Sequence, residues 1–208
     1  IETAGSLKDG KRIWALAKTG DAHKVLGSDL VDSYLLLATS YDLTFSTLAQ
    51  FTSVRVVCNN TLQQSLKDYI SRVSIPHFRD FNATDIHEQL GLGRAQWGAF
   101  SQALDAIAKI KLDSAKAKEV LGKVFVTPEK DITYVDPQVE KILRLFEGKA
   151  IGADIAGQTG WGLVNAVTEY ADHHKRARNQ GNRLDNSWFG ATANIKDAVF
   201  HEVLELTS

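Results

Sequence analysis

The dipeptide Asp9-Gly10 lies between two segments, residues 1–8 and 11–18, that are both expected to be β-strands. Both positions of the dipeptide tolerate a positive φ, which is what a two-residue hairpin turn requires. In the second segment, small apolar residues alternate with basic and aromatic ones, as on a strand with two unlike faces. Three further segments rich in Val, Leu, Thr and Phe are expected to be strands joined by short turns: 34–40, 44–50 and 53–58. This pattern predicts an antiparallel sheet.

The residues after this sheet are predicted to be mostly helical. Asn60 is expected to cap a helix that crosses the sheet, with Gln63 in its first turn. Amphipathic patterns predict further helices at 84–111 (with a break at 91–93), 114–121, 136–147, from 160 onward, and at 191–206. The fold class is therefore α+β. Residues 1–72 form the sheet and its crossing helix, and residues 73–208 form a helical part that packs on the same domain.

Composition restricts the kind of protein. The chain has 208 residues, of which 44% are hydrophobic, so it can bury a core. A net charge of -1 confines any nucleic-acid surface to a local patch. The single cysteine, Cys58, excludes an internal disulfide, and no signal peptide or membrane-spanning run is found, so a cytoplasmic protein without membrane contact is expected. Because the chain has no Met and begins at Ile1 inside a predicted strand, we interpret it as a fragment.

A glycine-rich turn followed by a helix with two unlike faces occupies residues 157–174. One polar stripe at i, i+4, i+7 and i+11 carries an amide, two carboxylates and a guanidinium: Asn165, Glu169, Asp172 and Arg176. Two interpretations stay open, a solvated outer face or a functional site. The glycines favour a site, because they allow backbone N–H groups to approach an anion at the helix start.

Four residues of this region are candidate catalytic residues: Asn165, Glu169, Asp172 and His173. Glu169 and His173 are spaced i, i+4 beside Asp172, which suits a divalent metal, and the two carboxylates can alternatively act as acid and base. No recognisable motif supplies the remaining ligands, so no metal site is predicted and the cofactor is unknown. Cys58 lies in an apolar strand and is expected to be a core residue rather than a nucleophile.

A basic run at residues 173–183 is followed shortly by Trp188, and the hairpin carries a second basic and aromatic set. Cations for phosphate and aromatic rings for base stacking are typical of single-stranded nucleic-acid binding. The candidate binding residues are Arg12, Trp14, Arg55, Lys175, Arg176, Arg178 and Arg183. The alternative is a solvated helix end followed by a core tryptophan.

Three segments carry a family resemblance: 12–18 (RIWALAK), 52–62 (TSVRVVCNNTL) and 160–170 (GWGLVNAVTEY). On these segments the chain resembles the phage/plasmid-like proteins built on a domain of unknown function of the DUF932 type. That family has no established activity, although its polar motif residues suggest an enzyme. The resemblance implies that those polar residues are Arg55, Asn60, Asn165, Glu169, Arg183 and Lys196.

The expected order of strands and helix in residues 1–72 is also similar to phage annealing proteins of the RecT, Redβ and Erf type, which assemble around a basic groove. The leading hypothesis is a phage- or plasmid-derived, homo-oligomeric protein that binds and anneals single-stranded DNA. The alternatives are a metal-assisted hydrolase or nuclease with a polar pocket, and a host-directed interaction protein. In each case Arg55 and Glu169 are expected to approach and neutralise one another.

Overall fold

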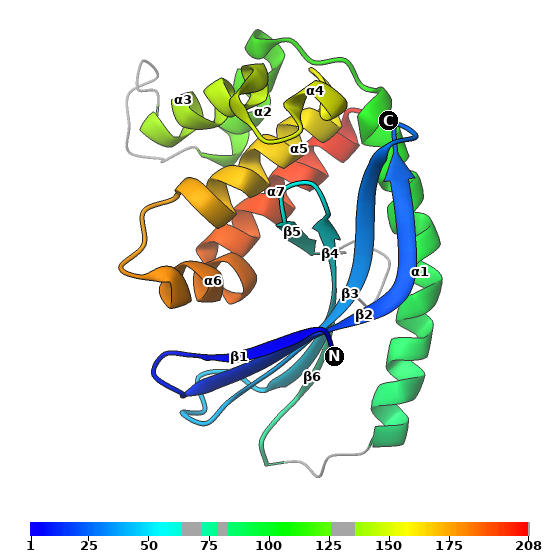
Figure 1. The fold of residues 1–208 in the computed structure, drawn as a ribbon, viewed down its shortest axis with the longest axis vertical. Coiled ribbons are helices and arrows are strands. Elements are labelled where there is room, and N and C mark those ends of the chain that lie inside the picture. The colour runs from blue at the N-terminus through cyan, green and yellow to red at the C-terminus, as the bar shows by residue number, and fades with distance from the viewer. Residues whose placement is uncertain (64–71, 79–82, 126–135, 208) are drawn as a thin grey trace.

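The computed structural model describes residues 1–63, 72–78, 83–125 and 136–207. A curled antiparallel sheet forms the N-terminal part, and helices follow it (Figure 1). The predicted α+β class is therefore confirmed.

Six strands of the described part form one sheet in the order β1-β2-β3-β4-β5, with β6 pairing beside β5 on β4. All pairs are antiparallel. The strands are β1 (Thr3–Leu7), β2 (Arg12–Val25), β3 (Asp29–Ser40), β4 (Thr47–Arg55), β5 (Asn60–Gln63) and β6 (Arg72–Ile75). β2 and β3 are long and curved, and they carry the curl of the sheet (Figure 1).

The Asp9-Gly10 turn is confirmed. Lys8, Asp9 and Gly10 all have positive φ (53°, 55° and 85°), and Lys11 N donates to Lys8 O over 3.2 Å. The prediction of two strands at 44–50 and 53–58 is wrong, because β4 runs through Thr52 without a turn. Thr52 pairs with β3 on one side and with β5 on the other, so a turn there would break both ladders.

The helix predicted from Asn60 is also wrong for residues 60–63, which form β5; residues 64–71 lie outside the described part. Asn59 is in the left-handed region (φ 54°), and Asn59 N donates to Arg55 O over 2.9 Å. This tight turn returns the chain along β4, where Asn60 pairs with Arg55. The pairing with β4 therefore overrides the local capping signal.

The helical elements are α1 (Ala83–Lys109), α2 (Ser114–Val124), α3 (Pro137–Arg144), η1 (Leu145–Lys149), α4 (Ala153–Ala156), α5 (Gly160–Glu169), η2 (Tyr170–His174), α6 (Gln180–Phe189) and α7 (Ala191–Glu205). The predicted break at 91–93 is absent, since α1 is continuous. Each of the two glycines in this segment costs a helix only about 1 kcal/mol, which a long helix tolerates. α4 and α6 were not predicted. η1 and η2 are π-helical turns that extend α3 and α5.

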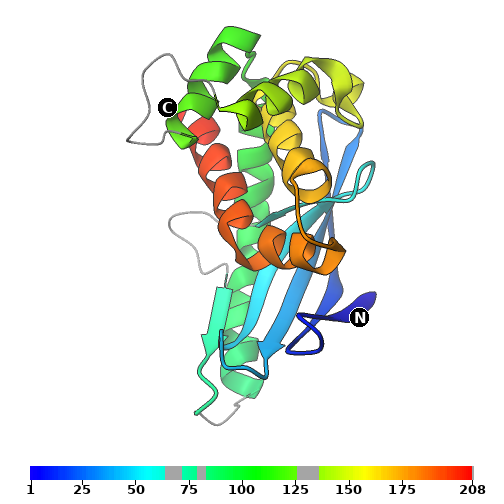
Figure 2. The same ribbon diagram turned by 90° about the vertical axis from the view of Figure 1, so that its left-hand side faces the viewer.

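α1 runs alongside the sheet, whereas α5, α6 and α7 gather around its β5 edge (Figures 1 and 2). Alternate residues of a strand point to opposite faces. Leu62 belongs to the core around α5 and α7, while the neighbouring Gln63 donates from Nε2 to Trp188 O of α6 over 3.0 Å. The short strand β5 is thus in contact with helices on both of its faces.

Two apolar clusters complete the packing. The larger joins α1, α5 and α7 to three sheet residues: Val25, Val31 and Leu62. The smaller lies between β2, β3 and α6: Leu16, Tyr34, Leu36 and Trp188. In the described part of the chain, no helix is both long and apolar enough to cross a membrane.

Candidate functional site

The glycine-rich start of α5 is a packing feature. A Cβ on Gly162 would lie 2.0 Å from Gly157 O, and one on Gly160 would lie 2.6 Å from Ile107 O. Thr159 caps the helix by accepting from Gly162 N, and Gly160 N donates to Ile110 O. Since Gly160 N and Gly162 N are used and the helix start is buried, the structure does not support the interpretation of this turn as an anion site.

The polar stripe of α5 is buried rather than solvated. Asn165 and Glu169 are 3% and 2% exposed. Asn165 Nδ2 donates to Trp161 O, and Asn165 O accepts from Asn60 Nδ2 over 3.4 Å. Glu169 Oε2 accepts from Ile151 N over 2.8 Å. The fourth member of the stripe, Arg176, lies exposed in the loop beyond η2.

Arg55 is buried, and its ion-pair partner is Asp29 rather than Glu169. Arg55 Nε lies 2.8 Å from Asp29 Oδ1, and Trp161 Nε1 donates to the same carboxylate. Arg55 Nη1 donates to Ile151 O, while Ile151 N donates to Glu169. Arg55 and Glu169 therefore meet through the Ile151 backbone, not directly. At 2% exposure the Arg55 side chain is not placed to contact phosphate.

The space enclosed by these motif residues is small. Arg55, Asn60 and Asn165 line a cavity of about 10 Å³ between β4, β5 and α5. That is about the space of one water molecule. Three of the residues that the family resemblance singles out, Arg55, Asn60 and Asn165, therefore converge, but they leave no room for a substrate.

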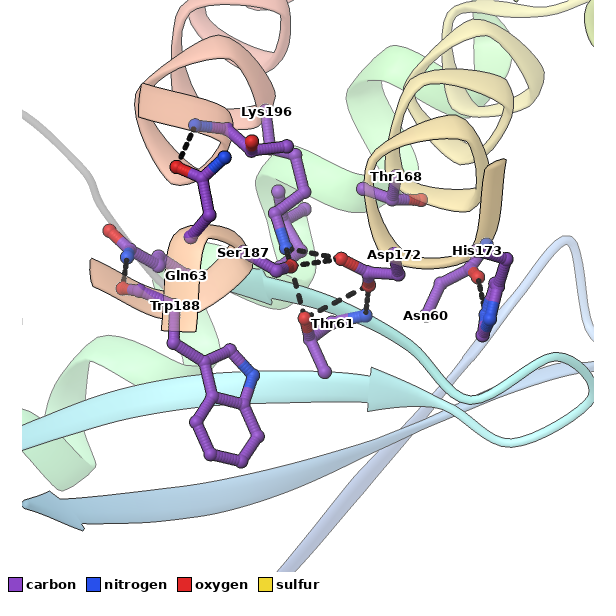
Figure 3. A network of polar contacts seen from close by, with 12 residues as sticks. Asn60, Thr61, Gln63, Thr168, Asp172, His173, Ser187, Trp188 and Lys196 are labelled. Carbon is purple, nitrogen blue, oxygen red and sulfur yellow. Dashed lines mark hydrogen bonds and ion pairs between the residues drawn. The ribbon is translucent and has the colours of Figure 1, made fainter. Parts of the chain in front are cut away.

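A second polar cluster joins η2, β5, α6 and α7 (Figure 3). Lys196 Nζ donates to Thr61 Oγ1 (2.9 Å), to Asp172 Oδ1 (2.9 Å) and to Ser187 Oγ (2.7 Å). Asp172 Oδ1 also accepts from Ser187 Oγ, and Asp172 Oδ2 accepts from Thr61 N (2.7 Å) and Thr61 Oγ1 (3.0 Å). Lys196 is 2% exposed, so this is a buried ion pair.

The protonation of this cluster follows from its hydrogen bonds. An ammonium has three protons, and Lys196 has three acceptors. Burial lowers the pKa of Lys196, and the Asp172 carboxylate opposes that shift. Four donors surround the two oxygens of Asp172, one of them the ammonium. Asp172 is therefore neutralised from within the protein, which leaves it little free charge to act on a metal or a substrate.

His173 is held beside the same strand. Its Nε2 lies 3.1 Å from Asn60 Oδ1 and 3.2 Å from Cys58 O, and both of these oxygens are acceptors. Nε2 therefore carries a proton. The predicted Glu169–His173 pair does not form, because Glu169 Oε1 lies 3.3 Å from His174 Nε2 instead. No three His, Cys, Asp or Glu side chains in the described ranges lie together as a metal site, so a metal-assisted reaction has no ligand set among them.

A groove of about 830 Å³ lies between the β1–β2 hairpin and the first turn of α6. Cations from both predicted basic segments line it: Lys8, Lys11, Arg12 and Arg178. Two carboxylates, Asp9 and Asp42, line it as well, together with the amides of Asn179 and Asn182. The fold thus brings together two basic sets that are far apart in the sequence.

Asp185 of α6 forms ion pairs with the hairpin and so links the two walls of this groove. Lys8 Nζ lies 3.4 Å from Asp185 Oδ2 and donates to Asn182 Oδ1, and Arg12 Nη1 pairs with Asp185 Oδ1. The Arg12 guanidinium also lies over the ring of Phe45, 4.9 Å from its centroid. These contacts offset part of the cationic charge and fix the hairpin against α6.

The other predicted binding residues lie outside this groove. Trp14 packs edge-on against Trp188 with ring centroids 4.7 Å apart, so these rings are part of the smaller core cluster. Lys175 is half-buried, and burial lowers its pKa. Arg183 lines a separate pocket. No aromatic side chain is among the groove's lining residues, so base stacking by Trp14 or Trp188 has no support there.

The sequence profile of a family described as a domain of unknown function (DUF932) matches residues 1–188. The chain belongs to this family. The match includes all three resemblance segments and Ser187, whereas Lys196 lies beyond it. No curated protein and no solved structure gives a significant match to the chain.

Sequence reasoning missed several members of the two buried clusters: Asp29, Thr61, Trp161 and Ser187. Asp29, Thr61 and Trp161 find partners far along the chain, as Thr61 does with Asp172 and Lys196. Ser187 is bonded to Asp172 and Lys196, which are 15 and 9 residues away. A polar residue in an otherwise apolar strand or helix was the one available signal, and it does not identify the partner.

Proposed function

We propose that this DUF932 domain binds single-stranded nucleic acid in the groove between the β1–β2 hairpin and α6. The observation that carries the proposal is the convergence of Lys8, Lys11, Arg12 and Arg178 on one open concavity. Lysine and arginine neutralise backbone phosphates whatever the base, and this supplies most of the affinity of sequence-independent binding.

The lining of the groove supports a single strand held by its backbone. A volume of about 830 Å³ accommodates a short stretch of one strand rather than a duplex. Because none of the described residues that line the groove is aromatic, bases are not captured by stacking on these residues. A strand held in this way keeps its bases free to pair, which is what annealing requires. This supports the proposed role in phage- or plasmid-derived annealing.

The charge of the groove sets the expected strength. Asp9 and Asp42 line it, and Asp185 pairs with Lys8 and Arg12. The excess of positive charge is therefore small, and we expect binding that weakens steeply as salt rises.

The test is a fluorescence-anisotropy titration of a labelled oligothymidylate at several salt concentrations. Lys11→Gln with Arg178→Gln removes two cations from the groove. The slope of log affinity against log salt should fall in magnitude by about 1.4, at about 0.7 for each phosphate contact on a single strand. The matched control is Lys118→Gln with Lys141→Gln, which makes the same change of charge at exposed positions of α2 and α3.

A slope for the groove variant equal to that of the control variant would place the strand elsewhere. No binding by the parent at low salt would end the proposal. Annealing and self-association are measured separately, by the rate at which complementary strands pair and by the mass of the protein in light scattering.

A further inference from the structure

A second pocket, of about 190 Å³, lies on the opposite face of α6 from the groove. The helix contributes one side of it at helical spacing: Gln180, Arg183, Leu184 and Ser187. The strand turn and η2 contribute the other side: Asn59, Thr61, Asp172 and His173. Thr61, Asp172, His173 and Ser187 can be followed in Figure 3. The groove is lined instead by Arg178, Asn179, Gly181 and Asn182.

This pocket is cationic, although it contains a carboxylate. Asp172 is paired with Lys196 Nζ at 2.9 Å and accepts three further hydrogen bonds. Its negative charge is therefore compensated by Lys196, which is not among the residues that line the pocket. Arg183 then supplies a net positive charge.

Arg183 has spare donors. Its Nε is buried and has no hydrogen-bond partner in the described part of the chain. A buried donor without an acceptor costs free energy, and a small shift of the guanidinium toward an anion in the pocket would give Nε its acceptor. Guanidinium donors match the geometry of phosphate oxygens, which favours phosphate over a monatomic anion.

The size and the apolar part of the lining define the ligand further. Typical ligand pockets begin at about 300 Å³, so this one takes a small group rather than a whole nucleotide. Leu184 forms an apolar wall beside the polar residues, which suits the organic part of an ester. We propose that this pocket binds a phosphate monoester, with Arg183 on the phosphate and Leu184 against the first carbons of the esterified group.

This proposal does not depend on the groove, and the phosphate can belong to a small molecule or to a strand terminus. The test uses isothermal titration calorimetry of the parent with ribose 5-phosphate, inorganic phosphate and ribose. We expect ribose 5-phosphate to bind more tightly than inorganic phosphate, and ribose not to bind. Arg183→Gln should weaken the binding of ribose 5-phosphate at least tenfold, because hydrogen bonds to a charged group are lost.

Arg144→Gln is the matched control, since it removes an exposed arginine of α3 that lines neither the pocket nor the groove and should leave the affinity for ribose 5-phosphate unchanged. In the parent, titration should shift the amide NMR signals of Thr61 and Gln180, which tests the site without any substitution. Equal binding by Arg183→Gln and the parent, unshifted signals at those residues, or no binding at millimolar ligand would each overturn the proposal.

Two oligonucleotides, one with a 5′-phosphate and one with a 5′-hydroxyl, distinguish a strand terminus from a small molecule as the source of the phosphate. A preference for the phosphorylated strand that is lost in Arg183→Gln assigns the pocket to strand ends. Equal affinity for the two strands, with ribose 5-phosphate still bound, assigns it to a small molecule. If neither oligonucleotide binds, the proposed groove function fails, while the calorimetric result stands on its own.

Discussion

Replacing Lys196 by Met is expected to be among the most damaging single changes in this chain. The side chains are similar in volume, so the effect isolates the charge and its three hydrogen bonds to Thr61, Asp172 and Ser187. Asp172 would be left as a buried carboxylate without a counter-ion, its side chain 9% exposed. Removing one partner of a buried ion pair costs about 3–5 kcal/mol of unfolding free energy. At this chain length the midpoint of thermal unfolding should fall by about 6–20 °C.

The assay is urea unfolding followed by circular dichroism, with the midpoint and the slope fitted together. Asp172→Asn in the Lys196→Met background should recover at least half of the loss, because the stranded charge is removed and the amide can still accept from Thr61. The folded pKa of Lys196 is lowered, so the unfolded state binds more protons between that value and 10.5. Over that range the stability of the parent should rise with pH relative to Lys196→Met. A Lys196→Met protein within about 1 kcal/mol of the parent would refute the buried ion pair.

Two further predictions concern the packing around α5 and β5. Gly162→Ala should destabilise the protein by about 3 kcal/mol or more, because the new Cβ meets Gly157 O at 2.0 Å. The control is Gly98→Ala, whose Cβ would have no neighbour within 4 Å and which should leave the urea midpoint unchanged or raised. The Cys58 thiol is buried, and burial raises its pKa, so reaction with a disulfide reagent at pH 8 should be slow until urea unfolds the chain. A rapid reaction in the native state would show that Cys58 is accessible.

Local signals predicted the elements that local chemistry decides. Asp9-Gly10 marked the first hairpin through its backbone freedom, and Asp136-Pro137 marked the start of α3, where Asp136 caps the helix. The same local chemistry made Asn60 a candidate helix cap, but Asn60 pairs with Arg55 of β4 in the sheet instead. That pairing depends on the turn at Asn59, where φ is positive. The sequence pattern did not predict this turn.

The candidate site was predictable in composition but not in arrangement. Both basic sets were identified, yet their meeting depends on how the hairpin lies against α6, an element that was not predicted. For the stripe on α5 the sequence left two interpretations open, a solvated face and a functional site. Its burial was not foreseen, because a polar face looks solvated unless the partners that satisfy it are known. Here those partners are Ile151 N and His174 for Glu169, and Trp161 O for Asn165.

The contacts around β5 also bear on how the chain folds during its synthesis. Thr61 is separated by 135 residues from Lys196, and Asp29 by 132 residues from Trp161. The sheet strands are made first, and the helices that cover the β5 edge and supply these bonds leave the ribosome after them. Until then the edge strand and its buried polar groups are open to pairing with other chains. We therefore expect the native state to be completed slowly and late. Before the helices are made, the nascent chain should need more protection from aggregation than a helical protein of the same length does.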